Sequence, residues 1–273
     1  MIGATLAAPK VRSVTNAEVD FFFQHGWVKI PQLIERDTAA DLLHRARSVF
    51  GEDGRAGIDQ LPKPAAHYET WFRTTCDAME DERFRALSLS TALGNNTARL
   101  LGRDGPIRLM LSDIGVKLPV ETGRGNPTTF HQDTPGHPYI ESNFLTAWVA
   151  LDEVAADMGA LQFYSGSHKL GNLGYTHDPA IRAQWQPILD KYCVLTEPVT
   201  LQPGDATFHI NGTMHGTQAN TSGQPRWSWM SVMVPGDARY TGAPHRYIDG
   251  RGFTQFGQLD HPTLPIIYSP EIT

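Results

Sequence analysis

The residues best suited to chemistry in this chain are three potential metal ligands, His131, Asp133 and His215. His131 and Asp133 form an H-x-D pair. On a strand, residues i and i+2 point to the same face, so an imidazole and a carboxylate could converge on one ion. His215 follows much later, after the Gly204-Asp205 turn and a short strand-like run. Two histidines and one carboxylate would leave one side of an Fe(II) ion open to a co-substrate and O2.

An H-x-D pair alone is weak evidence, since most such pairs are surface residues or satisfied core residues. The remaining pattern adds weight, because Arg226 follows His215 after a short stretch that contains Asn220 and Ser222. An arginine can grip a carboxylate through two parallel hydrogen bonds. A structural zinc site would instead be closed and usually built with cysteines.

The elements that must position these residues change character near residue 105. Before it, the pattern predicts helices over 15–26, with a Thr15/Glu18 capping box, over 37–50 and over about 81–101, and a short strand at 27–30. After it, short apolar or alternating runs separated by Gly and Pro favour a β-sandwich or barrel. These runs are 107–111, 116–120, 144–151, 161–164, 196–201, 206–210 and 227–234.

One helix is expected within the strand-rich part, over 178–190, where Asp178 precedes Pro179 in the order typical of a helix start. No flexible linker is evident. We therefore expect a single domain over 1–273, with a helical front at about 1–104, a β core at 105–235 and a C-terminal extension at 236–273.

Composition excludes several classes of protein. The 273 residues are 40% hydrophobic and 19% charged, which is typical of a globular chain. The net charge of −6 and the lack of a basic stripe argue against a nucleic-acid partner. The sequence contains no apolar run of roughly 18 residues, so no membrane helix is expected. The two cysteines, Cys76 and Cys193, exclude a disulfide framework and favour the cytoplasm.

Taken together, the motifs resemble the phytanoyl-CoA hydroxylase-like (PhyH) family of Fe(II)/2-oxoglutarate-dependent dioxygenases. The resemblance covers most of the chain and is densest over 117–226. Besides the H-x-D pair, it is carried by residues 26–30, 147–152, 158–161, 166–169, 204–205 and 215–226. Ser165 departs from the family pattern, which usually has a proline before Gly-Ser-His.

The resemblance implies a mainly β fold, with a double-stranded β-helix (jelly-roll, cupin-like) core and with N-terminal and inserted helices. It implies that His131, Asp133 and His215 hold Fe(II), and that 2-oxoglutarate and O2 are consumed while a C–H bond is oxidised, most simply by hydroxylation. Halogenating members have Gly or Ala in place of Asp133, so oxygenation is expected here. The implied 2-oxoglutarate site consists of Arg226, for the distal carboxylate, with Trp148, Thr217 and Ser228.

Aromatic residues near the metal motif and late in the core suggest a small, largely apolar organic substrate. A specialised metabolite or a catabolic intermediate would fit. These residues are Phe130, Tyr139, Phe144, Trp148, Trp227 and Trp229. The oligomeric state is not predicted. The same site could instead serve desaturation, epimerisation or cyclisation. A cupin-type isomerase or lyase would not need Arg226, and an inactive binding protein would not need a complete ligand set.

Other residues have structural interpretations. His168 fits a turn, and His209 fits a core position or one beside the metal ligands. His137 fits a substrate contact or a loop contact equally well. The helix over 178–190 is expected to cover a sheet face, with a lid as the alternative.

Overall fold

The structure is a computed structural model that describes residues 10–56, 75–245 and 247–271. Its strands are mostly short. In chain order they are β1 (Trp27–Ile30), β2 (Thr75–Asp77), β3 (Ile107–Lys117), β4 (Thr128–His131), β5 (Ile140–Glu141), β6 (Leu145–Ala150), β7 (Leu161–Ser165), β8 (Val194–Leu195), β9 (Ala206–Ile210), β10 (His215–Thr217), β11 (Arg226–Pro235), β12 (Arg239–Tyr240) and β13 (Ile266–Tyr268).

The α-helices lie mainly before the long strands. They are α1 (Asn16–His25), α2 (Arg36–Phe50), α3 (Glu82–Ser88), α4 (Thr91–Leu101) and α5 (Pro179–Tyr192). The expected capping box at Thr15 is present, and Gly26 ends α1 in the left-handed conformation with φ of 80°. No helix in the described part of the chain has the length and apolar character needed to cross a bilayer.

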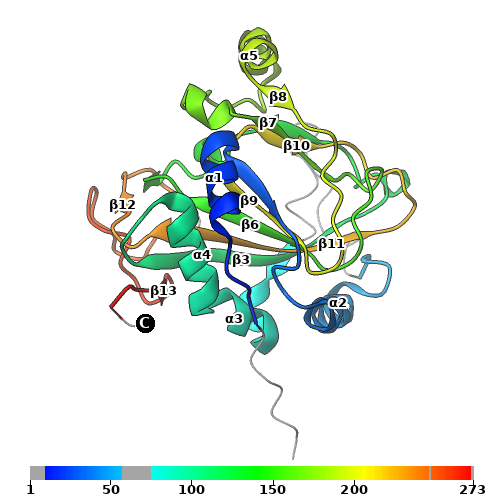
Figure 1. Ribbon diagram of the computed structural model, residues 1–273, viewed down its shortest axis with the longest axis horizontal. Coiled ribbons are helices and arrows are strands. Elements are labelled where there is room, and N and C mark those ends of the chain that lie inside the picture. The colour runs from blue at the N-terminus through cyan, green and yellow to red at the C-terminus, as the bar shows by residue number, and fades with distance from the viewer. Residues whose placement is uncertain (1–9, 57–74, 246, 272–273) are drawn as a thin grey trace, which may run out of the picture.

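The strands form two main antiparallel sheets (Figure 1). The larger sheet has the order β1-β9-β6-β11-β3-β13, and β2 also pairs with β3. The smaller sheet has the order β4-β10-β7-β8, while β5 and β12 form a separate pair. This strand-rich arrangement confirms the predicted jelly-roll core with N-terminal and inserted helices.

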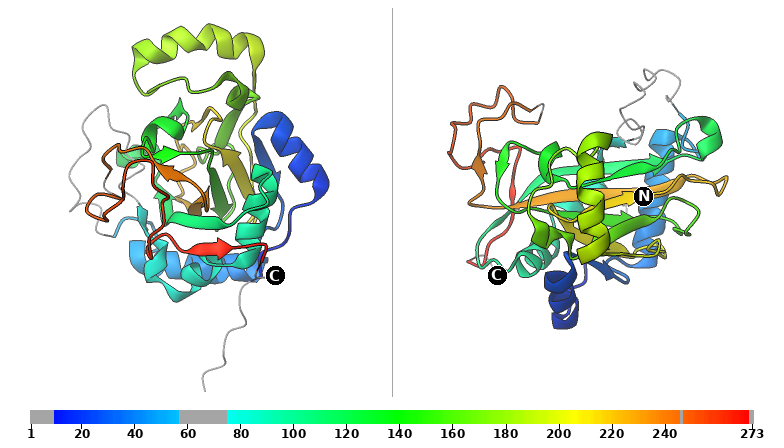
Figure 2. Two further views of the ribbon diagram at one scale, coloured as in Figure 1. Left: turned by 90° about the vertical axis from the view of Figure 1, so that its left-hand side faces the viewer. Right: turned by 90° about the horizontal axis from the view of Figure 1, so that it is seen from above.

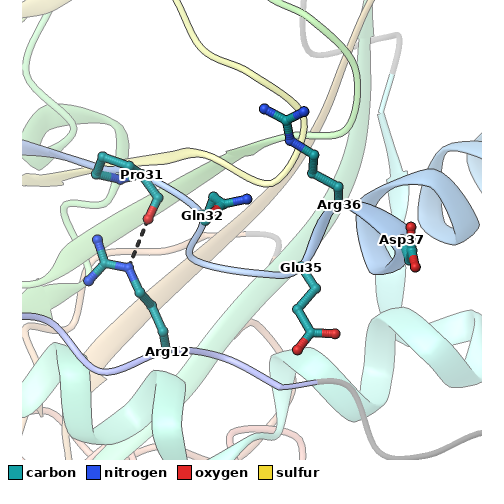
Figure 3. Close-up of a pocket in the computed structure, with 6 residues that line it drawn as sticks. All are labelled: Arg12, Pro31, Gln32, Glu35, Arg36 and Asp37. Atoms are coloured by element: carbon teal, nitrogen blue, oxygen red, sulfur yellow. Dashed lines mark hydrogen bonds between the residues drawn. The ribbon is translucent and has the colours of Figure 1, made fainter.

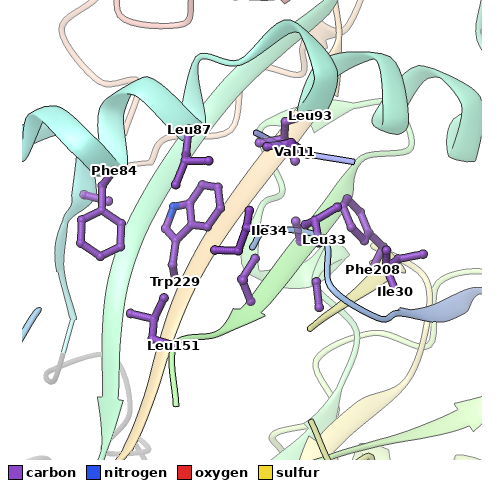
Figure 4. Close-up of a cluster of buried hydrophobic side chains, with 14 of the residues drawn as sticks. Val11, Ile30, Leu33, Ile34, Phe84, Leu87, Leu93, Leu151, Phe208 and Trp229 are labelled. Atoms are coloured by element: carbon purple, nitrogen blue, oxygen red, sulfur yellow. The ribbon is translucent and has the colours of Figure 1, made fainter. Parts of the chain in front are cut away.

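The outer face of the larger sheet packs against the N-terminal helices. Figure 4 shows Phe84 and Leu87 of α3 beside Trp229 of β11. Trp229 is fully buried there, as is Trp227 on the same face of the strand. The helical front therefore covers one face of the larger sheet, and the alternate residues of each strand are left to face the smaller sheet.

These alternate residues form cross-strand rows on the inner face of the larger sheet. Lys117 of β3 lies opposite Arg226 of β11. The next row contains only small side chains, since Ser228 lies between Gly115 of β3 and Ala150 of β6. The inner face thus presents a pair of cations at one end, followed by a row with little side-chain volume.

Helix α5 lies outside the smaller sheet, as Figures 1 and 2 show. It begins after the Asp178 cap, as the sequence predicts. Leu189 and Trp185 pack in a cluster with Tyr164 of β7 and Met214, on the face of the smaller sheet that points away from the larger one. The helix therefore covers that face, in agreement with the expected role.

The structure differs from the expected elements in three places. The helix over 81–101 is divided into α3 and α4, because the side chain of Ser90 caps a new helix by accepting from the N–H of Leu93. The runs at 107–111 and 116–120 form one continuous strand, β3. The strand at 196–201 is absent, since Pro198 has no N–H and the segment bonds to β7 only through Thr196 and Val199.

Candidate metal centre and co-substrate site

The three potential metal ligands come together in the interior between the sheets. His131 ends β4 and His215 begins β10, and the two lie opposite each other in the antiparallel pair. Asp133 lies two residues after the end of β4. One ligand atom from each residue lies within 4.8 Å of the others. The group can therefore surround one ion on one side and leave the opposite side open.

The H-x-D pair does not lie on one strand, so the alternation argument for it is wrong. β4 ends at His131, and Asp133 has helical backbone angles, with φ −71° and ψ −26°. The N–H of Asp133 donates to the carbonyl of Asn211 at 3.0 Å. The turn after β4, held by this bond, brings the carboxylate beside the imidazoles.

Backbone carbonyls fix which nitrogen of each histidine can face a metal. Nδ1 of His131 lies 2.7 Å from the carbonyl oxygen of Thr129, and Nδ1 of His215 lies 2.9 Å from that of Thr213. A carbonyl oxygen can only accept, so each Nδ1 carries the hydrogen and each Nε2 keeps a lone pair for a cation. Two such imidazoles and a carboxylate are donors that fit Fe(II).

The two oxygens of Asp133 have different surroundings. Oδ1 lies 3.8 Å from Nε2 of His131 and 3.7 Å from Nε2 of His215. Oδ2 accepts a hydrogen bond of 2.8 Å from the hydroxyl of Thr146 and lies 3.3 Å from Nε2 of His209. One oxygen therefore faces the two imidazoles, and the other is bound by side chains of β6 and β9.

The protonation states of the buried groups suit metal binding. Burial alone would raise the pKa of the Asp133 carboxyl, but the three imidazoles around it hold that pKa well below its usual range. Burial lowers the pKa of His215 well below the usual histidine value, and two neighbouring imidazoles add to this effect. An ionised carboxylate and a neutral imidazole are the forms that bind metal.

Arg226 is a buried cation on the same interior face. It is 8% exposed, its Nη1 donates to the carbonyl of Gly159, and its Cζ lies 4.9 Å from the ring centroid of Trp148. Nε has no hydrogen-bond partner, and no carboxylate of the described residues forms an ion pair with this side chain. Burial lowers the pKa of Arg226 to about 10, so the guanidinium stays charged at neutral pH.

The two predicted hydroxyl residues lie on neighbouring strands. Ser228, two residues after Arg226, donates from Oγ to the carbonyl of Gly115 at 3.2 Å. The Oγ1 atom of Thr217 accepts from Nζ of Lys117 and from the N–H of Thr128. The structure thus places Arg226, Trp148, Thr217 and Ser228 in the interior, and their contact with 2-oxoglutarate stays a prediction.

Among the residues that sequence reasoning missed, Thr146 and Lys117 bind side chains of this site. Thr146 binds Asp133, and Lys117 binds Thr217. Lys117 is 4% exposed. A signal existed for each, since Thr146 shares a strand face with Trp148, and Lys117 is a charged residue that ends an otherwise largely apolar run. His209, which was given two possible positions, lies beside the metal ligands.

The other histidines of the described residues lie outside the ligand group. His168 is in a 3-10 helix, with Nε2 3.3 Å from the carbonyl oxygen of Phe23. Nδ1 of His137 lies 2.8 Å from the hydroxyl of Tyr139, and its ring packs against His245. His137 thus makes loop contacts, and a contact with substrate stays a prediction.

Most aromatic residues that suggested an apolar substrate lie in packed clusters. Trp227 and Trp229 face the helices, since they alternate with Arg226 along β11. Phe130 packs near α5. Two more belong to a cluster near β5 and β12: Tyr139 and Phe144. Of the six residues, only Trp148 contacts the co-substrate side chains described above.

A surface pocket lies apart from the metal centre, at the turn between β1 and α2 (Figure 3). Nε of Arg12 donates to the carbonyl of Pro31 at 2.8 Å across it. The remaining lining residues are Gln32, Glu35, Arg36 and Asp37. None of the predicted site residues lines this pocket, so we do not assign the chemistry to it.

Comparison with known proteins gives consistent results. A methylphosphonate hydroxylase from Gimesia maris is 25% identical over 264 residues, which cover 91% of this chain and 90% of the relative. The solved structure of SnoK, a non-heme alpha ketoglutarate dependent carbocyclase from nogalamycin biosynthesis, has a TM-score of 0.75 at 25% identity and covers 94% of this chain and 98% of its own.

A second structural relative shows the shared fold with its cofactors present. The epimerase SnoN, solved with Fe3+, alpha ketoglutarate and nogalamycin RO, has a TM-score of 0.72 at 22% identity and covers 92% of this chain and 97% of its own. At this level of identity the likeness concerns the shared fold.

A family description, Phytanoyl-CoA dioxygenase (PhyH), matches residues 22–228 of the chain. The match begins within α1 and ends in β11, two residues beyond Arg226. It therefore includes the three potential metal ligands and most strands of both main sheets. Because it spans well over half of the sequence, this protein belongs to the phytanoyl-CoA dioxygenase family and is an Fe(II)- and 2-oxoglutarate-dependent dioxygenase.

Proposed function

We propose that this enzyme hydroxylates an unactivated C–H bond of a small, largely apolar organic molecule. The observation that carries the proposal is the one-sided ligand group of His131, Asp133 and His215. When bound there, iron and 2-oxoglutarate supply the oxidising chemistry, with O2 consumed and succinate and CO2 released. The three side chains would hold the ion from one side and leave room for the reactants on the other.

The carboxylate of Asp133 favours oxygenation over halogenation. It fills the ligand position that would otherwise be open to a halide, and Thr146 holds its second oxygen at 2.8 Å. The Nδ1 contacts of His131 and His215 keep both Nε2 atoms in the acceptor form. The protein's own contribution at this end is therefore a fixed set of three ligand atoms.

We further propose that Arg226 binds the distal carboxylate of 2-oxoglutarate. Its buried charge has no paired carboxylate among the described residues, and its Nε is unpartnered. Trp148 lies against the guanidinium and would border the same molecule. The small side chains of Gly115, Ala150 and Ser228 follow Arg226 on this face, so little side-chain volume competes with a carbon chain there.

The interior near the ligand group offers both apolar and polar contacts to a substrate. Phe163 lies opposite His215 in the β7–β10 pair, but it is fully buried and stacks on Trp27, so it supports the ligand group from behind. Met230 lies opposite Trp148 in the β6–β11 pair. The ring of His177 lies 4.8 Å from that of His131. These contacts support a small substrate with an apolar part, and we propose that the enzyme acts in the cytoplasm as one domain.

Ring closure or epimerisation is the second candidate reaction. It is favoured by the similarity to SnoK, whose 25% identity equals that of the methylphosphonate hydroxylase. Both reactions begin with the same positioned C–H bond, and only the product distinguishes them.

The test is a product analysis. The purified protein is loaded with Fe(II) without O2, and 2-oxoglutarate is added while the absorption spectrum is recorded. Oxygen uptake and succinate are then measured with a panel of small apolar molecules and with methylphosphonate. We expect a new charge-transfer band, coupled succinate release and a product with one added oxygen. A product lacking two hydrogens, or an isomer, would identify the second candidate, and no 2-oxoglutarate-dependent band would contradict the proposal.

A further inference from the structure

Lys117 is a second buried cation beside the proposed 2-oxoglutarate anchor. It lies directly opposite Arg226 in the β3–β11 pair and is 4% exposed. Burying an ammonium group is costly unless the surroundings compensate its lost hydration. A buried lysine next to a buried arginine is therefore a feature that needs a reason beyond packing.

The ammonium group contacts β10 and the residue after it. Nζ donates to Oγ1 of Thr217 and, at 3.0 Å, to the carbonyl of Gln218. Gly159 lies against the same side chain, because a Cβ placed on it would be 3.1 Å from Cε of Lys117. The carbonyl of Gly159 also accepts from Arg226. Both cationic side chains are thus fixed against one glycine.

The contact with Lys117 determines what the Thr217 hydroxyl can do. A hydroxyl oxygen has two lone pairs and one hydrogen. Both lone pairs of Thr217 Oγ1 are used, since it accepts from Lys117 and from the N–H of Thr128 at 3.2 Å. Its hydrogen has no acceptor among the described residues. The hydroxyl is therefore left as a donor only, and the adjacent positive charge strengthens it in that role.

We infer that Lys117 is a positioning residue that fixes the Thr217 hydroxyl as a hydrogen-bond donor to a carboxylate of 2-oxoglutarate. The inference deepens the proposed function and rests on it. Without the ammonium group, a lone pair of Thr217 is free and the hydroxyl can rotate, so the bound anion loses a fixed donor beside Arg226.

The first experiment measures binding of 2-oxoglutarate itself. The Fe(II)-loaded enzyme is titrated without O2, and the charge-transfer band gives the dissociation constant for wild type and Lys117→Met. Lys191→Met, on the exposed face of α5, is the matched control. We expect Lys117→Met to raise the dissociation constant roughly tenfold or more, as for loss of a charge-assisted hydrogen bond. Iron content and the melting temperature should match wild type.

The second experiment tests whether Lys117 acts through Thr217. Thr217→Val and the double variant with Lys117→Met complete a double-mutant cycle. We expect the double variant to bind 2-oxoglutarate about as weakly as the weaker single variant. Losses that multiply would overturn the link between the two residues. Thr217→Ser keeps the hydroxyl and should bind like wild type.

The outcomes separate this inference from the proposed function. If wild type gives no 2-oxoglutarate band, the proposed function fails. If wild type binds and Arg226→Leu does not, but Lys117→Met binds within twofold of wild type, only the inference fails. Should Lys117→Met fold poorly, Lys117→Gln replaces it, because the amide keeps a donor but not the charge; unchanged binding in Lys117→Gln would likewise contradict a role for the ammonium charge.

Discussion

Nε2 of His209 lies 3.3 Å from Oδ2 of Asp133, so a histidine outside the ligand group holds the carboxylate oxygen that faces away from the other two ligands. Thr146 binds the same oxygen from the neighbouring strand. Together they leave Oδ1 as the oxygen directed toward His131 and His215. The carboxylate is therefore oriented before any metal binds.

Replacing His209 should weaken iron binding. His209→Leu removes the contact with Asp133 while keeping an apolar side chain in a buried position. We expect Fe(II) affinity to fall roughly 10- to 100-fold, as is typical when an outer partner of a metal ligand is lost. Anaerobic equilibrium dialysis measures it, with exposed His44→Leu as the control. An unchanged affinity would show that Thr146 alone orients the carboxylate.

Removing a ligand should remove the metal. His131→Ala and His215→Ala are each expected to lose most bound iron, because two remaining donors cannot retain the ion against dialysis. Iron per chain is measured by metal analysis, and His168→Ala, outside the group, is the control. Full iron occupancy in both ligand variants would mean that the metal binds elsewhere.

Asp133→Gly should lose most oxygenation, because the only anionic ligand is removed. Wild type supplied with chloride and its substrate should give no halogenated product, which mass spectrometry checks. A chlorinated wild-type product would overturn the hydroxylase assignment.

Replacing Arg226 should affect 2-oxoglutarate and leave iron in place. A charge-assisted bond of this kind contributes about 1.5–3 kcal/mol, so Arg226→Leu should raise the KM for 2-oxoglutarate at least about tenfold. Arg226→Lys keeps the charge but not the paired geometry, and should fall between wild type and Arg226→Leu. Steady-state succinate release measures both. Equal KM values in all three proteins would move the role to another residue.

Gly159→Ala should disturb both cations at once. Gly159 has a positive φ of 69°, and a Cβ on it would lie 2.7 Å from the carbonyl oxygen of Gln218. Gly123 has nearly the same φ of 73° and nothing within 4 Å of its Cβ position. Gly123→Ala should therefore lower the free energy of unfolding, measured by chemical denaturation, only by the backbone strain of order 1 kcal/mol. Gly159→Ala should lower the free energy of unfolding by more than this and should also weaken 2-oxoglutarate binding. Equal losses of stability in the two variants would show that the carbonyl of Gln218 moves aside at little cost.

The sequence predicted the large elements well and the ligand-bearing strands poorly. β6, β9 and β11 have apolar runs long enough to be recognised, and the Thr15 and Asp178 caps marked two helix starts. β4 and β10 contain four and three residues. Such short strands have no measurable alternation, so they were not predicted even though the metal motif led directly to them.

The sequence named the residues of the candidate ligand group but did not reveal how the backbone brings them together. The resemblance pointed to His131, Asp133 and His215, and the structure brings them together. The backbone turn at Asp133 depends on Asn211, which is distant in sequence, so local pattern could not reveal it. The contact of Lys117 with Thr217 likewise depends on how the two sheets pack against each other, because β3 and β10 belong to different sheets.

The proposed iron ligands and the proposed anchor belong to different sheets. His131 and His215 lie on strands of the smaller sheet, and Arg226 lies on the larger one. A 2-oxoglutarate molecule held by the metal at one end and by Arg226 at the other would act as a removable crosslink across the barrel. Its binding energy would then oppose separation of the two sheets, in proportion to the logarithm of its concentration above the dissociation constant. Amide hydrogen exchange should slow in both β10 and β11 when the metal and 2-oxoglutarate are present together. With only one of them present, exchange in either strand should slow less.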